Sequence, residues 1–153
     1  MLTQAAGRVG RSDRPGTVLI QAYDIDHYAV TCAARQDYES FYEREMPFRR
    51  QLRYPPFGCL CLIRISSRDE GLAADAALEI EAYIRRLKER YRELSDLELL
   101  RAAQAPIRRI DYTHRWQILL KHDAERVLSA VMTRVSALRL PDGVHLSLRL
   151  DPG

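Results

Sequence analysis

The chain has 153 residues, enough for an ordinary domain with a hydrophobic core. Hydrophobic residues make up 46% and charged residues 29%, a balance that is typical of folded soluble proteins and excludes a disordered chain. No apolar run approaches the roughly 20 residues of a membrane span, and the first residues lack the basic and apolar blocks of a signal peptide. The three cysteines lack the spacing of a small secreted protein. We therefore expect a cytoplasmic protein that does not bind membranes.

Arginine dominates the basic residues of the chain. The formal net charge is only +3, but Lys88 and Lys121 are the only lysines among 24 basic side chains. A planar guanidinium can bind phosphate through two hydrogen bonds, so this composition suits a nucleic-acid partner. A GC-rich genome would give the same bias. Both explanations stay open at this point, because composition does not locate a site.

The first part of the chain, residues 1–55, is expected to contain one short strand and a helix. A β-branched and apolar run at residues 17–21 follows a Pro-Gly turn signal and predicts a buried strand. Residues 27–52 show helical spacing, and Pro47 is expected to break or kink that helix. Pro55 and Pro56 are compatible with neither a helix nor a central strand, so we place a domain boundary there.

The second part, residues 56–153, alternates between strand and helix patterns. The predicted elements are a strand at 58–66, a helix at 69–94, strands at 97–104 and 115–121, a helix from Asp123 and a strand at 144–150. The expected cap of the first helix is Ser67 or Asp69, and its apolar stripe begins at Leu72. The order β-α-β-β-α-β predicts an α+β fold, a split βαβ arrangement with two helices on one face of a sheet.

A Gly- and Arg-rich string near the N-terminus is a candidate phosphate-binding motif. Residues 4–11 read Gln-x-x-Gly-Arg-x-Gly-Arg, with Gly7 and Gly10 allowing a close backbone approach. Arg8 and Arg11 are three residues apart, so both can face one anion. A guanidinium supplied during phosphoryl transfer stabilises the charge that develops on the γ-phosphate. A solvated basic turn would have the same sequence, and spacing alone does not separate the two readings.

A second candidate site is the segment 108–115 between two predicted strands. It contains Arg108, Arg109, Tyr112 and Arg115. Arginines can follow a phosphate backbone, and an exposed tyrosine can stack on a base. An exposed hairpin with solvated charges is the alternative, and it stays open.

The tryptophan and the cysteines are read mainly as core residues. Trp116 could stack on a base, but its phase with Ile118 and Leu120 favours a position in the core. Cys59 and Cys61 lie on one face of a strand without a third ligand nearby, so we predict no metal site.

Taken together, these motifs resemble the PriA family of primosomal replication-restart DNA helicases. The string at residues 4–11 is similar to the sixth conserved motif of superfamily 2 helicases. The matching segments further along are the Val-Leu-Ile-Gln run at 18–21, the pattern Tyr-x-x-Phe-Tyr at 38–42, Tyr-Pro-Pro-Phe at 54–57, Arg-Trp-Gln-Ile-Leu-Leu-Lys at 115–121 and Leu-Asp-Pro at 150–152. The chain departs from the family where a glycine is missing from the turn near Ala103 and where Arg149 replaces an aspartate.

The resemblance implies a domain organisation and a function. Residues 1–55 would be the end of a second RecA-like helicase lobe with its motif VI and linker helix. Residues 56–153 would be a C-terminal DNA- and partner-binding domain, similar to a ribosomal small-subunit protein. The parent protein would be a nucleoid-associated, ATP-dependent 3′ to 5′ DNA helicase that recognises stalled or branched replication forks and restarts replication by primosome assembly.

The resemblance also implies cofactors for such a parent. It would use ATP and Mg²⁺, and it would hold zinc in an insertion that this chain lacks. No Gly-x₄-Gly-Lys-Ser/Thr loop and no Asp-Glu-x-His box occurs in the 153 residues. We therefore expect neither a cofactor nor ATP hydrolysis in this chain alone.

Site residues and partners follow from the same resemblance. Arg8 and Arg11 would be arginine fingers of the parent, supported by Gln4, Gly7 and Gly10. The expected partners are forked or single-stranded DNA, the single-strand-binding protein and other primosome proteins. Lys121 and Arg126 are the expected basic contacts for the acidic tail of the single-strand-binding protein. The alternative is a stand-alone nucleic-acid-binding or protein-interaction module without catalysis.

Overall fold

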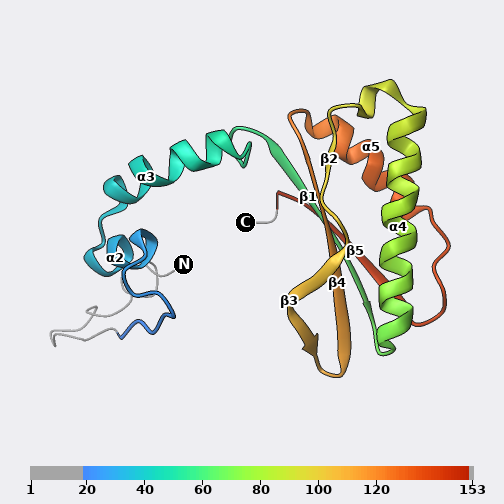
Figure 1. The fold of residues 1–153 in the computed structure, drawn as a ribbon, viewed down its shortest axis with the longest axis horizontal. Helices are drawn as coiled ribbons and strands as arrows, with labels where there is room; N and C mark the ends of the chain where they lie inside the picture. Colours follow the sequence, from blue (N-terminus) through green and yellow to red (C-terminus); the bar gives the residue numbers. More distant parts are fainter. Residues whose placement is uncertain (1–18, 152–153) are drawn as a thin grey trace, which may run out of the picture. The chain divides into compact units, whose positions relative to one another are not determined.

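The computed structural model describes residues 19–151 (Figure 1). The chain forms two compact units, Met1–Leu52 and Arg53–Gly153. In the part that the structure describes, the first unit contains two helices, α2 (Tyr28–Arg35) and α3 (Tyr38–Gln51). The motif at residues 4–11, with Gln4, Gly7, Arg8, Gly10 and Arg11, lies outside the described residues.

The single helix predicted at residues 27–52 is interrupted. Gln36 adopts a left-handed conformation with φ of 55°, which ends α2. Asp37 then caps α3, because its carboxylate accepts a hydrogen bond from the backbone N–H of Ser40 at 3.0 Å. The predicted break at Pro47 is wrong, since α3 continues through it to Gln51. The missing N–H of a proline removes only one hydrogen bond of the helix ladder.

The strand predicted at residues 17–21 is also wrong at residues 19–21. Leu19, Ile20 and Gln21 belong to no strand, and residues 17 and 18 lie outside the described part. Residues 19–52 form no other strand with which this run could pair. An apolar run becomes a strand only when a neighbouring strand satisfies its backbone hydrogen bonds.

The second unit has the predicted order of strands and helices, except that two strands, β2 and β3, stand where one was predicted. Its elements are β1 (Cys59–Ser67), α4 (Glu70–Arg90), the 3₁₀ turn η1 (Arg92–Leu94), β2 (Glu98–Leu99), β3 (Ala103–Ile110), β4 (Thr113–His122), α5 (Glu125–Ser136) and β5 (Val144–Leu150). The antiparallel sheet has the order β2-β4-β1-β5, and β3 pairs with the same edge of β4 as β2 does. This is the strand arrangement of a split βαβ fold, in which α4 and α5 cover one face of the sheet (Figure 1).

The strand predicted at residues 97–104 is wrong. The structure has the two-residue strand β2 there, and the long strand β3 begins only at Ala103 and includes Arg108 and Arg109. Only Ala105 is buried on β3. An edge strand that is exposed along most of its length lacks the apolar alternation by which a strand is recognised in a sequence.

The core lies between the sheet and the two helices. On β1, Cys61, Ile63 and Ile65 are fully buried, as their alternation predicts. The N-cap of α4 is Asp69, whose carboxylate accepts a hydrogen bond from the N–H of Leu72 at 3.0 Å. Leu72 itself is 38% exposed, so its assignment to the apolar stripe is wrong. The remaining core side chains are those of Ala73, Ala76, Ala77, Ile80, Ile84 and Leu87 on α4, Ile118 and Leu120 on β4, and Leu128, Val131 and Val135 on α5.

Two contacts fix the start of β1. At its start, a Cβ added to Gly58 would lie 2.6 Å from the carbonyl oxygen of Arg53, so no side chain fits there. Asp151 follows β5 and binds Leu60 twice, since its carboxylate accepts from the Leu60 N–H and its own N–H donates to the Leu60 carbonyl, both at 2.7 Å. Asp151 therefore completes the pairing of β1 with β5. Among residues 19–151, no helix is long and apolar enough to cross a membrane.

Candidate nucleic-acid interface

The segment predicted to bind nucleic acid is the tip of a β-hairpin whose turn has two residues. Asp111 and Tyr112 connect β3 to β4, with φ values of 47° and 61°. A turn with two positive φ angles matches the twist of the flanking strands. Arg109 and Ile110 are in register with His114 and Thr113, and the register shifts between Gln104 and Arg109. The hairpin therefore places the four predicted residues, Arg108, Arg109, Tyr112 and Arg115, on two paired strands and their turn, instead of on a loose loop.

Arg109 and Tyr112 pack on each other at the tip. The guanidinium carbon of Arg109 lies 5.0 Å from the centre of the Tyr112 ring, within the range of a cation–π contact. Arg109 is also in register with His114, whose Nδ1 lies 3.6 Å from a carboxylate oxygen of Glu70. Tyr112 is 76% exposed, so one arginine and one aromatic ring are presented together at the surface.

Arg115 projects from the opposite face of the hairpin. It pairs with Ser66 of β1, and successive side chains of a strand alternate between the two faces. Within residues 19–151, neither Arg108 nor Arg115 makes a hydrogen bond or an ion pair, so both guanidinium groups can bind an anion. Together with Arg109 and Tyr112, they give the tip the chemistry of a phosphate-binding surface.

Trp116 packs against the core beside Ile65, with which it is in register. Its phase along β4 predicted this position. The ring also borders a small cavity of about 230 Å³ between the hairpin and the first turn of α4. The Trp116 ring therefore connects the base of the hairpin to the core.

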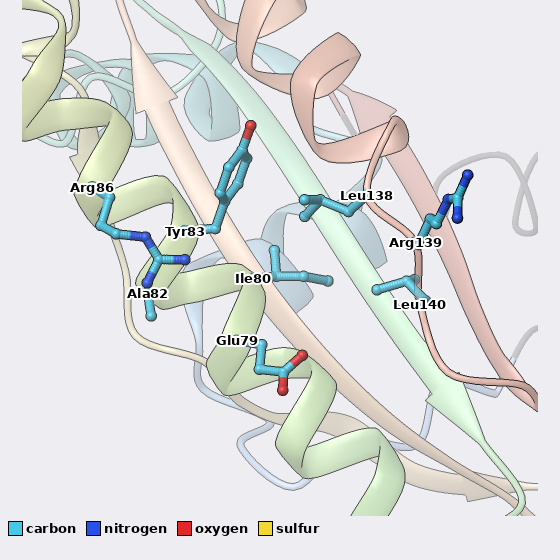
Figure 2. A pocket seen from close by; sticks show the side chains of 8 residues that line it. All are labelled: Glu79, Ile80, Ala82, Tyr83, Arg86, Leu138, Arg139 and Leu140. Atoms are coloured by element: carbon cyan, nitrogen blue, oxygen red, sulfur yellow. The ribbon is translucent and has the colours of Figure 1, made fainter.

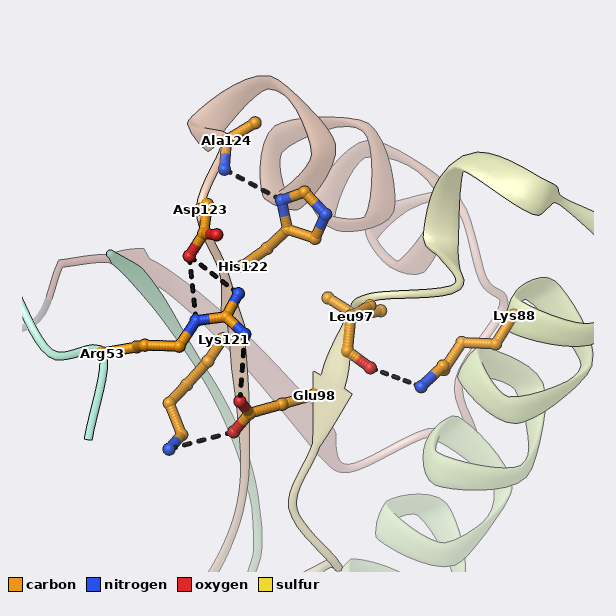
Figure 3. Close-up of polar contacts among 8 residues, drawn as sticks. All are labelled: Arg53, Lys88, Leu97, Glu98, Lys121, His122, Asp123 and Ala124. Carbon is orange, nitrogen blue, oxygen red and sulfur yellow. Dashed lines mark hydrogen bonds and ion pairs between the residues drawn. The ribbon is translucent and has the colours of Figure 1, made fainter. Parts of the chain in front are cut away.

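The two residues proposed from the resemblance as partner contacts lie in different surroundings, and Figure 3 shows those of Lys121. Lys121 is held by the protein itself, because its ammonium lies 3.1 Å from Glu98 and 5.1 Å from the centre of the Tyr54 ring, and its side chain is only 12% exposed. Arg53 binds the same Glu98 at 3.6 Å and also binds Asp123 at 2.7 Å. Lys121 is thus part of an ionic cluster at the end of the sheet.

Arg126 is exposed in the first turn of α5. It lines a hollow of about 520 Å³ between α5 and η1, together with His122 and Arg92, and Lys121 does not line that hollow. The structure therefore does not place the two proposed partner contacts in one pocket.

A second hollow, of about 320 Å³, lies on the helical side of the unit and contains none of the predicted site residues (Figure 2). Ile80 and Tyr83 of α4 line it from one side and Leu138 from the other. Arg86 and Arg139 are exposed at its edge and make no ion pair in the described part of the chain.

The cysteines of the second unit belong to the core. Burial raises the pKa of the Cys61 thiol to about 11, so the thiolate needed for metal binding or nucleophilic attack is disfavoured at neutral pH. Burial also raises the pKa of Cys59. Among the described residues, no group of three or more His, Cys, Asp or Glu side chains could hold a metal ion.

Comparison with known proteins decides the family. Residues 50–153 match the model of the primosomal protein N C-terminal domain. The chain belongs to the PriA family. It is 36% identical over 135 residues to the replication restart protein PriA of Bacillus subtilis and 33% identical over 153 residues to that of Synechocystis. A stretch of 57 residues is 49% identical to PriA of Chlamydia pneumoniae.

The chain spans only a small share of these relatives. The matches cover 88% and 99% of the chain but 16% and 17% of the PriA proteins from Bacillus subtilis and Synechocystis. The second unit thus corresponds to the C-terminal domain of PriA proteins.

Proposed function

We propose that this chain is the C-terminal part of an ATP-dependent DNA helicase that recognises stalled or branched forks and restarts replication by assembling a primosome. The observation that carries the proposal is the match of residues 50–153 to the PriA C-terminal domain, within relatives named replication restart proteins. Arg8 and Arg11 would supply the arginine fingers of a second RecA-like lobe. The loop that binds the ATP phosphates and Mg²⁺ would lie elsewhere in such a parent, because these 153 residues contain no Walker A loop. Zinc would be held by the insertion that the resemblance implies.

In this proposal the second unit binds forked or single-stranded DNA through the β3–β4 hairpin. Arg108 and Arg115 have no partner in the described part of the chain, and Arg109 is packed on the exposed ring of Tyr112. Phosphate contacts release counterions from DNA, so binding should weaken steeply as the salt concentration rises.

Replacement of Arg108, Arg109 and Arg115 by alanine is expected to weaken binding of single-stranded DNA by about tenfold or more at 50 mM salt. The measurement is a fluorescence anisotropy titration at several salt concentrations. Alanine at Arg86, Arg92 and Arg139 is the matched control, since it removes the same charge from the helical side. Equal affinities of the hairpin and control variants would remove the hairpin from the DNA interface.

We further propose that the hollow beside Arg126 receives the acidic tail of the single-strand-binding protein. Arg126 and Arg92 supply positive charge there, and Val127 supplies apolar surface. Charge reversal by Arg126→Glu is expected to weaken a tail peptide by about tenfold or more, because a basic contact becomes repulsive. Isothermal titration of the peptide measures this, with Arg86→Glu as the control. Unchanged affinity in Arg126→Glu would exclude Arg126 from the contact.

A further inference from the structure

The face of the sheet opposite the helices carries a set of cations that the hairpin proposal does not use. Ile63 and Ile65 of β1 point into the core, so the side chains between and beside them, Leu62, Arg64 and Ser66, project from the opposite face. We call this surface the open face. In register with these β1 residues, β4 and β5 place further side chains on it.

Three arginines form a diagonal across the open face. Arg115 of β4 is in register with Ser66, and Arg149 of β5 is in register with Leu62. Arg64 lies between them on the central strand β1. Each step along this diagonal crosses one strand and two residues, which separates neighbouring arginines by about 7–8 Å. The diagonal continues the hairpin, because Arg115 belongs to both.

The strands β1, β4 and β5 place basic but no acidic side chains on the open face. The side chains that β1, β4 and β5 place on it are those of Leu60, Leu62, Arg64, Ser66, Arg115, Gln117, Leu119, Lys121, His145, Ser147 and Arg149, none of which is acidic. The nearest carboxylate in register is Glu98 on β2, and Lys121 and Arg53 already bind it. The open face is therefore complementary to a polyanion.

The central arginine has unused hydrogen-bonding capacity. The Nε atom of Arg64 is buried and has no hydrogen-bond partner among the described residues. With the residues at 19–151, Arg64, Arg115 and Arg149 form no ion pair. A buried donor without an acceptor is unfavourable, so an arriving anion that rearranges the Arg64 side chain would gain a charge-assisted hydrogen bond.

We propose that the open face binds a single DNA strand, whose backbone phosphates contact Arg115, Arg64 and Arg149 in turn. This inference rests on the proposed DNA binding and extends the interface from the hairpin onto the sheet. One line of cations matches one backbone, as in grooves that bind single strands. The open face has no aromatic side chain from β1, β4 or β5, so recognition there rests on phosphates and is independent of base sequence.

The test uses the whole 153-residue chain and fluorescein-labelled oligothymidylate. Arg64→Gln combined with Arg149→Gln is expected to lower affinity about tenfold at 50 mM salt. The salt dependence of log K should also become shallower by about 1.4, since about 0.7 is lost for each phosphate contact on a single strand. Arg86→Gln combined with Arg139→Gln removes the same charge from the helical side and is expected to leave both quantities unchanged in comparison with wild type.

A further variant separates this inference from the proposed function. If the wild-type chain does not bind the oligonucleotide, DNA binding itself is refuted. If Arg108→Ala with Arg109→Ala weakens binding while the Arg64 and Arg149 variant binds like the control, only the open face is overturned. Tighter binding of a duplex than of a single strand, or equal binding of an acidic peptide of matched charge, would also contradict the assignment.

The half-buried position of Arg64 calls for a readout that does not depend on substitution. In the wild-type chain, the NMR signals of the Arg64 and Arg149 side-chain N–H groups are expected to shift when oligothymidylate is added. The signal of Arg86 is expected to stay in place. Arg149 is exposed, so Arg149→Glu alone should fold normally and still weaken binding. Unshifted Arg64 and Arg149 signals at saturating oligonucleotide would overturn the proposal.

Discussion

Alanine at Arg11 is expected to lower the kcat of DNA-stimulated ATP hydrolysis by about 10³-fold in the full-length helicase that we propose contains this segment. KM should change little. The reason is that an arginine finger makes its best contacts only when charge redistributes on the γ-phosphate, so its loss acts on the transition state and not on ATP capture. Arg8→Ala is expected to act in the same direction, because the two residues lie three apart in one Gly- and Arg-rich motif.

Two further variants sharpen this test. Arg11→Lys should not restore turnover, since an ammonium cannot reproduce the two-pronged contact of a guanidinium. Arg14→Ala lies just outside the motif and is the matched control. Steady-state kinetics give kcat and KM, and titration with a non-hydrolysable nucleotide gives affinity. Near-normal turnover in Arg11→Ala would end the finger assignment, and a joint loss of affinity and folding would indicate a purely structural role.

Ile63→Ala is expected to destabilise the second unit by about 2–5 kcal/mol. Ile63 is fully buried on the central strand β1, in register with Ile118 on one side and Leu148 on the other. Removal of its side chain leaves a cavity that surrounding β-sheet and helix residues cannot readily fill. Such a loss is a large part of the stability of a typical domain.

Urea unfolding monitored by the fluorescence of Trp116 measures this effect. The midpoint should fall while the slope m stays unchanged, which would show that stability and not compactness has changed. Ile107→Ala is the matched control, because Ile107 is 62% exposed on β3, and it should stay within about 0.5 kcal/mol of wild type. A similar loss in both variants would mean that Ile63 does not lie in the core as described.

Strong periodicity explains which elements were predicted well. The alternation at residues 144–150 gave β5 with its observed bounds, and the β1 alternation placed Cys61, Ile63 and Ile65 in the core. The strand β3 was missed because only Ala105 is buried on it. Where a segment has no buried face, hydrophobic periodicity carries no signal, and only the pairing with β4 makes it a strand.

The sequence predicted only part of the candidate site. A cluster of three arginines and one tyrosine in a short segment was visible in the sequence, and it led to the hairpin tip. Arg64 and Arg149 were not predicted as site residues, although each alternates with core residues along its own strand. Their neighbourhood depends on the register of β1 with β4 and β5, which places Arg115 beside Ser66 and Arg149 beside Leu62 and is set by packing.

The sequence by itself determined the family, the βαββαβ order and the core face of β1, because motifs and periodicities are local properties of the chain. The tertiary structure decided which cations face the same side. It showed that Lys121 is held by Glu98 and Tyr54, whereas Arg64, Arg115 and Arg149 share the open face without acidic neighbours from their own strands. The physical reason is that the pairing of strands distant in sequence fixes which charged side chains lie next to each other. A basic side chain that is buried beside a carboxylate is neutralised, whereas one without such a neighbour stays available for a ligand.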